Sequence, residues 1–267
     1  MDLGLKNKVA IVTGANNPQG IGAAVALALA GEGVKLVLTY KRMAGTYDED
    51  KVDRDGTDRY NRARGGDAAE VEQKLRSMGA DCLVIEGDLT DERCVKEVFE
   101  RATERFGKVD ILVNNAADGA NDDTIETLTA DTISYTFDVN VRGSLLMTRE
   151  FVKRRGDYGR IVNLSTDAAQ VFAGQITYGA SKAAVEALTR SIALEVGKYG
   201  ITVNCVAPGP TQTGWIDDEL ERTVVPDIPL GTLIQPEDIA DAIVFLVSER
   251  AAMITGQVIK VSGGHAL

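Results

Sequence analysis

Residues 13–22 read Thr-Gly-Ala-Asn-Asn-Pro-Gln-Gly-Ile-Gly, and they separate a β-branched run from an apolar, alanine-rich run. The first run, Val9–Thr13, predicts a buried strand, and the second, Ile21–Ala30, predicts a helix. Glycine lets the backbone approach a ligand closely, and the first turn of a helix offers free N–H groups and a positive dipole end. A strand, a glycine turn and a helix in this order predict a site for the pyrophosphate of a dinucleotide. A glycine loop that merely turns the chain is the alternative.

The same alternation continues along the chain. Six further β-branched runs are expected to form strands, and amphipathic stretches between them are expected to form helices. The expected strands are Val34–Thr39, Cys82–Glu86, Ile111–Val113, Arg160–Leu164, Thr202–Val206 and Val258–Val261, and the expected helices lie near 67–78, 92–106, 130–154, 176–197 and 237–248. Strands separated by helices form right-handed βαβ units. We therefore predict an α/β protein of the Rossmann type, in which residues 1–267 form a single domain with a doubly wound parallel sheet of about seven strands and helices on both faces.

Composition excludes several classes of partner. The 267 residues carry 29 basic and 40 acidic side chains, and a net charge of −11 argues against nucleic acid or an anionic membrane as the main partner. No apolar run approaches the ~20 residues that span a bilayer, and the N-terminus lacks the layout of a signal peptide. Three widely separated cysteines indicate a reducing compartment, so a cytoplasmic location is expected. The single histidine, His265, argues against a His-dependent triad, and we expect no metal site.

Two segments interrupt the alternation. Residues 41–66 carry thirteen charged side chains, and a solvated loop is the favoured interpretation over a disordered insertion, a lid or an oligomer contact. Residues 209–235 contain three of the six prolines and the only tryptophan, Trp215. A long loop beyond the carboxyl end of a strand is where open α/β sheets place ligand contacts, so we expect 209–235 to shape a substrate pocket. Trp215 and Ile216 are candidates for its apolar wall, although Trp215 is equally well explained as an interface or core anchor.

A tyrosine and a lysine near the start of the helix expected over 176–197 form a candidate acid–base pair. Tyr178 and Lys182 are four residues apart, which places them on one helix face. A free phenol has a pKa of about 10. An ammonium some 4 Å away favours the phenolate by about 4 kcal/mol at an effective dielectric of about 20, which bounds the lowering of the phenol pKa near three units before desolvation is counted. The pair therefore predicts proton transfer without histidine.

Other motifs lie in a fixed order around this pair. They are Asn140 within Asp138-Val139-Asn140-Val141-Arg142-Gly143, Ser165 thirteen residues before Tyr178, Asn114-Asn115-Ala116-Ala117 after the fourth expected strand, and Pro208-Gly209-Pro210-Thr211-Gln212-Thr213 after the sixth. With the glycine turn, they resemble the short-chain dehydrogenase/reductase family from Lys8 to Gly264, and most of all its 3-oxoacyl-carrier-protein reductase-like branch. Five residues separate Gly14 from Gly20, two more than is usual in that family, and Ala117 replaces a usual glycine.

The resemblance implies a catalytic set and a mechanism. Asn140, Ser165, Tyr178 and Lys182 are the implied catalytic residues. Hydride would pass between the nicotinamide and a carbonyl carbon, while Tyr178 donates or removes the proton on oxygen. Ser165 would position the carbonyl oxygen, Lys182 would tune Tyr178 and bind the nicotinamide ribose, and Asn140 would support a water. A small-molecule carbonyl or alcohol substrate and a homotetramer are also implied.

The end of the second strand bears on the choice of cofactor. It reads Leu38-Thr39-Tyr40-Lys41-Arg42, with two cations and no carboxylate. An acidic residue at this place binds the ribose 2′-hydroxyl of NAD, whereas cations accommodate the 2′-phosphate of NADP. We therefore expect NADP(H) to be favoured over NAD(H), although Lys41 and Arg42 are also explained as the start of the charged segment. Gln19, where many NADP-dependent relatives carry a basic residue, weakens the prediction.

The remaining cofactor contacts follow from the resemblance. Asp88 would bind the adenine, although it is also explained as a helix cap. The implied cofactor-binding residues are Gly14, Asn17, Gly20, Ile21, Gly22, Tyr40, Lys41, Arg42, Asp88, Leu89, Asn115, Tyr178, Lys182, Pro208, Gly209, Thr211 and Thr213.

Two alternative functions stay open. The long glycine turn is similar to that of enoyl reductases, but that group usually spaces its tyrosine and lysine more widely than Tyr178 and Lys182. A dinucleotide-binding sensor without turnover is the second alternative, and the complete set of four candidate catalytic residues argues against it.

Overall fold

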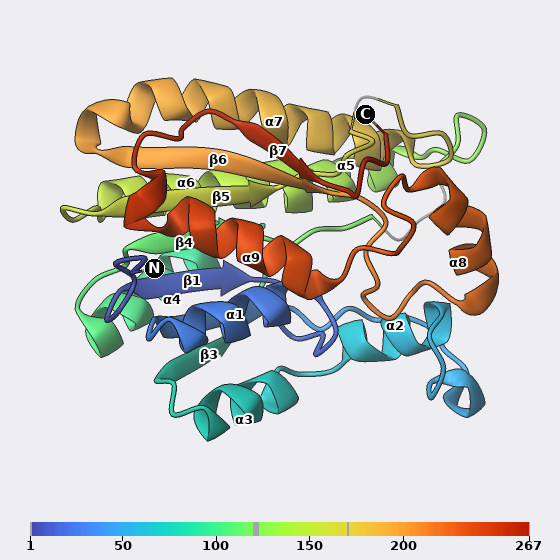
Figure 1. The fold of residues 1–267 in the computed structure, drawn as a ribbon, viewed down its shortest axis with the longest axis horizontal. Helices are drawn as coiled ribbons and strands as arrows, with labels where there is room; N and C mark the ends of the chain where they lie inside the picture. Colours follow the sequence, from blue (N-terminus) through green and yellow to red (C-terminus); the bar gives the residue numbers. More distant parts are fainter. Residues whose placement is uncertain (1, 120–122, 170, 267) are drawn as a thin grey trace.

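A sheet of seven parallel strands forms the centre of the computed structural model, which describes residues 2–119, 123–169 and 171–266 (Figure 1). The strands lie in the order β3-β2-β1-β4-β5-β6-β7. Their bounds are β1 Val9–Thr13, β2 Lys35–Tyr40, β3 Cys82–Glu86, β4 Ile111–Asn114, β5 Gly159–Leu164, β6 Ile201–Pro208 and β7 Val258–Val261. The strand order reverses direction between β1 and β4, where a doubly wound sheet opens a crevice for ligands. The predicted single-domain Rossmann-type fold is confirmed.

Helices cover both faces of the sheet, as expected. The helices α1 (Ile21–Gly31), α3 (Ala69–Ser77) and α9 (Pro236–Val247) pack on one face, where Leu29, Val71 and Ile243 are buried in a common core. The helices α4 (Glu92–Phe106), α6 (Ser144–Lys153) and α7 (Ile176–Val196) pack on the other, around Phe99, Phe151 and Val196. The other elements are η1 (Glu49–Lys51), α2 (Thr57–Gly65), α5 (Ala130–Phe137), η2 (Asp138–Gly143), η3 (Gly197–Tyr199), α8 (Asp218–Val224), η4 (Val225–Asp227) and η5 (Glu249–Ala251).

The long helix expected over 130–154 is interrupted. The π-helical segment η2 lies between α5 and α6 and contains Asn140. The Asn140 side chain makes hydrogen bonds to another loop, and Ser144 Oγ donates to the Asn140 carbonyl oxygen at 2.9 Å. A π-bulge widens a helix locally and is frequent at functional sites. Helical periodicity alone does not distinguish this segment from an ordinary α-helix.

The segment 41–66 is largely exposed, as its charge predicted, but it is not an irregular loop. It contains η1 and α2, and its ends are attached to other parts of the protein. The Gly56 N–H donates to the Gly214 carbonyl oxygen at 2.9 Å, and Asn16 Nδ2 donates to the carbonyl oxygens of Arg64 and Gly66 at 3.1 and 3.0 Å. These contacts hold α2 across the carboxyl edge of the sheet, beside the glycine turn.

Truncation of Phe99 provides a test of the core on the α4 face. Phe99 is fully buried, whereas Phe245 of α9 is 44% exposed. We expect Phe99→Ala to lower the free energy of unfolding by about 3–5 kcal/mol, because it removes buried apolar surface and leaves a cavity. Phe245→Ala is the matched control and should cost less than about 1 kcal/mol. Urea unfolding followed by circular dichroism measures both; equal losses would show that this core is not packed as described.

Candidate active site

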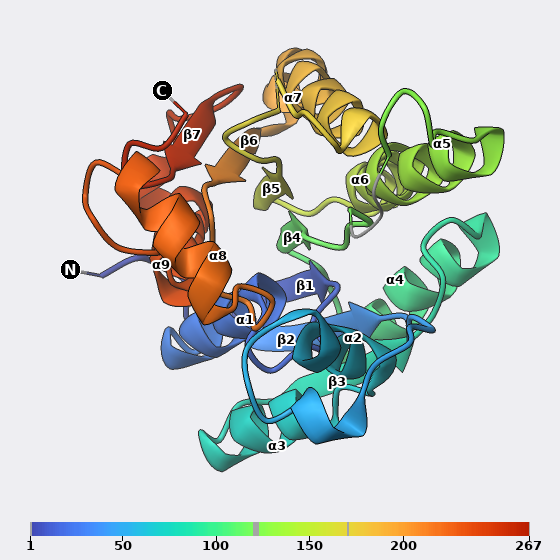
Figure 2. The ribbon, with the colours of Figure 1, turned by 90° about the vertical axis from the view of Figure 1, so that its right-hand side faces the viewer.

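The residues that the sequence singled out gather at the carboxyl edge of the sheet. Figure 2 faces this edge, where α2 lies in front of β2 and α8 lies in front of α9 and α1. The glycine turn follows β1, the segment with Asn115 follows β4, and Pro208 ends β6. Parallel strands bring all these ends to one side, which is where open α/β sheets bind ligands.

The glycine turn packs closely against the end of β4. Gly14 has a φ of +68°, and a Cβ there would lie 2.8 Å from Ala116 Cα. A Cβ at Gly22 would lie 2.6 Å from the Gly14 carbonyl oxygen. Asn115 Nδ2 donates to the carbonyl oxygens of Thr13 and Gly14 at 2.8 and 3.0 Å. These positions need glycine because a side chain would push the turn away from β4.

The first turn of α1 fits an anionic group. Its N-cap is Gly20, which has no side chain to accept from the helix N–H groups, and no acidic residue lies in the first turn. Asn17 does not cap the helix: its Oδ1 accepts from the Gln19 N–H at 3.0 Å, and its Nδ2 donates to the Thr213 carbonyl oxygen at 3.0 Å. Unpaired N–H groups and the helix dipole favour phosphate, so the residues present fit a dinucleotide pyrophosphate.

The two cations after β2 are paired with carboxylates. Lys41 Nζ lies 2.6 Å from Asp88 Oδ2, and this hydrogen bond raises the pKa of Lys41. Arg42 Nη2 lies 3.5 Å from Glu86 and 3.7 Å from Asp67. The Lys41 and Arg42 side chains are about half exposed, at 42% and 52%. Exposed ion pairs of this kind contribute only ~0–1 kcal/mol each, so an incoming anion replaces a carboxylate partner at low cost.

Asp88 also accepts two hydrogen bonds from Thr90. Its Oδ1 accepts from the backbone N–H and from the hydroxyl of Thr90, at 2.9 and 2.7 Å. The N-cap of α4 is Asp91, which accepts from the Arg93 N–H at 2.8 Å. Asp88 is thus engaged by Lys41 and Thr90 but does not cap α4, and the alternative role as helix cap is wrong.

Asn140 joins the loop after β4 to the start of α7. Its Nδ2 donates to the Asp118 carbonyl oxygen and to Ser181 Oγ, both at 2.9 Å, and its Oδ1 accepts from the Asp118 N–H at 2.7 Å. The side chain is 1% exposed. With all its hydrogen-bonding groups engaged in a dry site, Asn140 fixes the position of both segments.

Lys182 is buried and attached to β5. Its Nζ donates to the Leu164 carbonyl oxygen at 2.8 Å, and burial lowers its pKa to about 8. The same Nζ lies 5.6 Å from the centroid of the Tyr178 ring. The ammonium is therefore beside the tyrosine, as expected, but its hydrogen bond goes to the backbone.

The Tyr178 ring is packed among apolar groups. Phe172 contacts it edge to face, with centroids 5.5 Å apart, and a Cβ at Gly119 would lie 2.6 Å from the ring. Desolvation raises the pKa of Tyr178, and the electrostatic influence of Tyr60 and of Asp167 adds to the effect. The sequence predicted a lowered pKa, and for the protein alone that expectation is wrong, because desolvation outweighs the field of an ammonium that is directed at Leu164.

Ser165 faces α7. Its Oγ donates to Glu186 Oε1 at 2.9 Å and lies 3.4 Å from the Lys182 carbonyl oxygen. The residue is 4% exposed. Ser165 is therefore buried against α7, next to the helical turn that contains Lys182.

The segment after β6 is fixed by backbone hydrogen bonds. The Gly209 N–H donates to the Val261 carbonyl oxygen at 3.1 Å, and Trp215 Nε1 donates to the Thr211 carbonyl oxygen at 3.0 Å. Trp215 is 41% exposed and lies at the surface of the loop, whereas Ile216 is 1% exposed and packs in the core. Of the two candidate wall residues, only Trp215 presents surface to solvent.

Sequence reasoning missed two polar contacts at this edge. Arg64 Nη2 of α2 lies 3.7 Å from Asp118 Oδ1, and the two side chains are 15% and 5% exposed. Asp167 Oδ2 lies 2.8 Å from Nδ1 of His265, the only histidine, so the C-terminal segment is attached to the end of β5. Both contacts join residues far apart in sequence, and no local spacing signals them.

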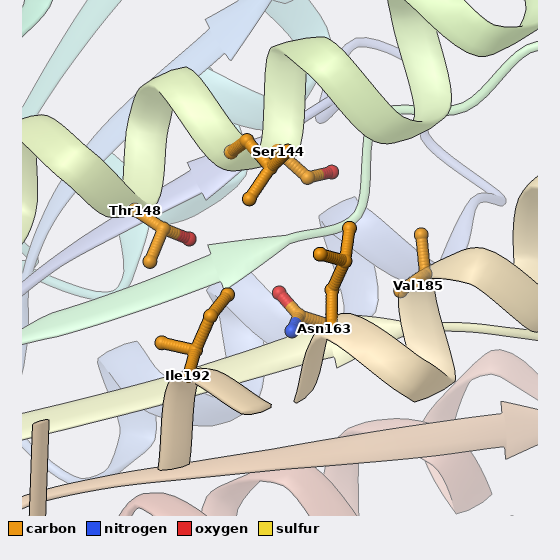
Figure 3. A pocket seen from close by; sticks show the side chains of 7 residues that line it. Ser144, Thr148, Asn163, Val185 and Ile192 are labelled. Atoms are coloured by element: carbon orange, nitrogen blue, oxygen red, sulfur yellow. The ribbon is translucent and has the colours of Figure 1, made fainter. Parts of the chain in front are cut away.

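A small pocket lies on the sheet below this edge, between α6 and α7 (Figure 3). Ser144, Thr148, Asn163, Val185 and Ile192 contribute to its lining. Its volume of about 10 Å³ leaves room for about one water molecule and not for a substrate. The substrate must therefore bind elsewhere.

The described residues contain neither a metal-binding cluster nor a membrane-spanning helix. No group of three or more His, Cys, Asp or Glu side chains among them is arranged to hold a metal ion. Within the same residues, no helix has the length and hydropathy required to cross a membrane.

Comparison with known proteins identifies the family. The family model described as enoyl-(acyl carrier protein) reductase matches residues 56–266. An uncharacterized oxidoreductase of Bacillus subtilis, YjdA, is 32% identical over 97% of both chains, and the 3-oxoacyl-[acyl-carrier-protein] reductase FabG of Staphylococcus aureus is 34% identical over 96% of this chain and 97% of its own.

Solved structures agree with these relatives. A short-chain dehydrogenase/reductase from Serratia marcescens and a blue fluorescent protein from a metagenomic library, in complex with NADPH, each superpose with a TM-score of 0.83 at 30% identity. Each comparison covers 98% of this chain and 99% of the other. The chain therefore belongs to the short-chain dehydrogenase/reductase family and is an NAD(P)-dependent oxidoreductase.

Proposed function

We propose that this enzyme transfers hydride between NADP(H) and a carbonyl or secondary alcohol, with Tyr178 as the general acid and base. The observation that carries the proposal is the position of Lys182 Nζ, which is held by the Leu164 carbonyl oxygen and lies 5.6 Å from the Tyr178 ring. Both residues lie at the edge of the sheet where the glycine turn fits a dinucleotide. The nicotinamide, when bound, supplies the hydride, and this chain supplies orientation and the proton.

The Tyr178 phenol holds the proton that reduction requires. An ordinary phenol is protonated at neutral pH, and desolvation raises the pKa of Tyr178 further, so its proton is present when the oxygen of a carbonyl accepts it and the carbon receives hydride. The carbonyl carbon gains two electrons and one hydrogen as hydride, and the oxygen gains the proton of Tyr178. The Lys182 ammonium then stabilises the phenolate that remains. In oxidation the same phenolate removes the proton from the alcohol.

Lys182 and Asn140 prepare the site for this step. The pKa of about 8 keeps Lys182 largely charged at neutral pH, where its field acts on Tyr178. Lys182 would also bind the nicotinamide ribose hydroxyls. Asn140 holds the Asp118 backbone against Ser181 of α7, which keeps the loop after β4 in register with the tyrosine. A hydroxyl at the end of β5 would complete the set by donating to the substrate oxygen.

The preference for NADP(H) rests on the end of β2. Lys41 and Arg42 follow β2 directly and are about half exposed, so both can bind an anion. A 2′-phosphate carries about −1.5 to −2 charge at neutral pH and would replace carboxylates as their partner. The structural neighbour in complex with NADPH supports the same cofactor.

A second candidate function is enoyl reduction. The family model that matches this chain carries that description, and the glycine turn is long. The spacing of Tyr178 and Lys182 favours carbonyl reduction instead. Activity on crotonyl-type thioesters with none on ketones would make enoyl reduction the favoured function and carbonyl reduction the alternative.

Replacement of the tyrosine tests the mechanism. Tyr178→Phe removes only the hydroxyl, so we expect an intact fold, unchanged NADPH binding and a kcat on ketones about 10²–10⁴-fold lower, since a general acid contributes that much. Cofactor fluorescence measures binding, and loss of NADPH absorbance measures turnover. Near-normal turnover would remove Tyr178 from the mechanism.

Replacement of the two cations tests the cofactor preference. The double variant Lys41→Ala and Arg42→Ala should raise the KM for NADPH about 10- to 100-fold and the KM for NADH less than about threefold, because charged hydrogen bonds to the 2′-phosphate are lost. The control is Lys51→Ala with Arg54→Ala, which removes the same charge from exposed positions of the same segment. Equal changes for both cofactors would contradict the assignment.

We also infer a homotetramer that forms through α6, α7 and the C-terminal strand. Leu145 of α6 and Leu194 of α7 are 37% and 88% exposed, and surface of this kind is buried at oligomer interfaces. Leu194→Glu should reduce the mass measured by sedimentation, because it places a charge in the interface. Leu230→Glu, at a position that is 77% exposed outside these elements, is the control and should leave the mass unchanged. A wild-type monomer would contradict the inference.

A further inference from the structure

We propose that Thr166, and not Ser165, supplies the hydroxyl that donates to the substrate carbonyl oxygen. This inference rests on the proposed function, because it assigns one position within that site. It follows from the direction of two consecutive side chains at the end of β5.

Ser165 points into the interface between β5 and α7. Its hydroxyl proton is used in the hydrogen bond to Glu186 Oε1, at 2.9 Å. Asn163, two residues earlier, points the same way, and its Nδ2 donates to Thr189 Oγ1 of α7 at 2.8 Å. Residues i and i+2 of an extended chain share a face, so Ser165 continues the row that packs against α7. A substrate oxygen would have to compete with the half-buried Glu186 carboxylate for its proton.

Thr166 lies on the other side of the same extended segment. The Ser165 N–H donates to the Val206 carbonyl oxygen at 2.8 Å, and the Asp167 N–H donates to the Pro208 carbonyl oxygen at 2.9 Å. The chain thus remains paired with β6 through Asp167. Successive side chains along such a segment alternate, so the Thr166 side chain points away from Glu186.

The Thr166 hydroxyl has an unused proton and is not completely sealed from solvent. It makes no hydrogen bond with the residues that the structure describes, and it is not among the unpaired hydroxyls sealed from solvent, such as those of Thr39 and Thr202. Thr166 is buried at 9% exposure, against 4% for Ser165. A hydroxyl with an unused proton is suited to orient a substrate oxygen.

The surroundings of Thr166 are those of the proposed reaction. Its neighbour Asp167 pairs with Pro208, where the segment expected to hold the nicotinamide begins. The Ala169 N–H donates to the Thr166 carbonyl oxygen at 3.2 Å, and a Cβ at Gly179, next to Tyr178, would lie 3.9 Å from the Ala169 carbonyl oxygen. Thr166 therefore begins a turn that contacts both the candidate nicotinamide segment and the start of α7.

The sequence predicts Ser165 for this role because it lies thirteen residues before Tyr178. That spacing depends on the length of the loop between β5 and α7. If the loop is one residue shorter, the spacing from the same strand position to the tyrosine falls to twelve residues, while the strand itself is unchanged. The register of β5 on β6 is fixed by paired residues from Gly159 to Leu164. The pairing of β5 with β6 therefore identifies the side chain that faces the site more directly than the spacing to Tyr178 does.

Three variants test the assignment against ketone reduction with NADPH. Thr166→Val keeps the shape and removes the hydroxyl, so we expect kcat/KM for the ketone to fall about 100-fold while the Kd for NADPH stays within about twofold. Thr166→Ser restores the hydroxyl and should return kcat/KM to within about fivefold of wild type. Ser165→Ala is the comparison variant; it should lower Tm, because Glu186 loses a partner, and should lower kcat/KM less than about fivefold.

The reverse pattern would overturn the assignment: a 100-fold loss in Ser165→Ala with near-normal Thr166→Val, or a Thr166→Val loss that Thr166→Ser fails to rescue. Tm values of all three variants identify any loss that is due to unfolding. A wild-type enzyme that reduces no ketone in a broad panel would instead refute the proposed function, and the assignment of Thr166 with it.

Discussion

The hydrogen bonds between β5 and α7 fix the positions of the residues to which we assign the chemistry of this protein. Three contacts join the strand to the helix at successive turns: Asn163 to Thr189, Ser165 to Glu186, and the Leu164 carbonyl oxygen to Lys182. The first and the last are buried, so their polar groups would lose their partners in a dry core if the helix slid or rotated. The three contacts together therefore fix the position of α7 along β5 and its rotation about its own axis. The position of Tyr178 at the edge of the sheet follows from them.

The segment 41–66 connects the elements that surround this edge. It is attached to the glycine turn through Asn16, to the loop after β4 through the Arg64–Asp118 ion pair, and to the loop after β6 through Gly56. A helix held at three places across the strand ends limits the directions from which a substrate can approach. We infer that α2 forms part of the wall of the site, together with α8 (Figure 2).

Local sequence patterns predicted most of the fold. The seven strands lie where β-branched runs were found, because a parallel strand buried on both faces must be apolar along its whole length. The glycine turn could also be predicted from the sequence, because Gly14 and Gly22 lie so close to neighbouring backbone that a side chain has no room. These features depend on residues that are close in sequence.

Features that depend on distant partners could not be predicted. The raised pKa of Tyr178 results from burial, with Phe172 and Gly119 packed against its ring, and the π-helical turn at Asn140 contains a side chain that bonds to the distant Asp118. The direction of the Ser165 hydroxyl depends on Glu186, twenty-one residues later. Charge content indicated exposure for 41–66, but it did not reveal that Asn16 would anchor a helix there.

Transfer of deuterium tests the central claim most directly. Reduction of a ketone with NADPH that carries deuterium at both hydrogen positions of nicotinamide C4, followed by mass spectrometry and NMR of the product, locates the transferred hydrogen. If the site acts as proposed, one deuterium appears on the carbinol carbon, and the hydroxyl proton comes from solvent by way of Tyr178. An unlabelled alcohol, or deuterium found only at the β-carbon of an enoyl thioester, would contradict this account.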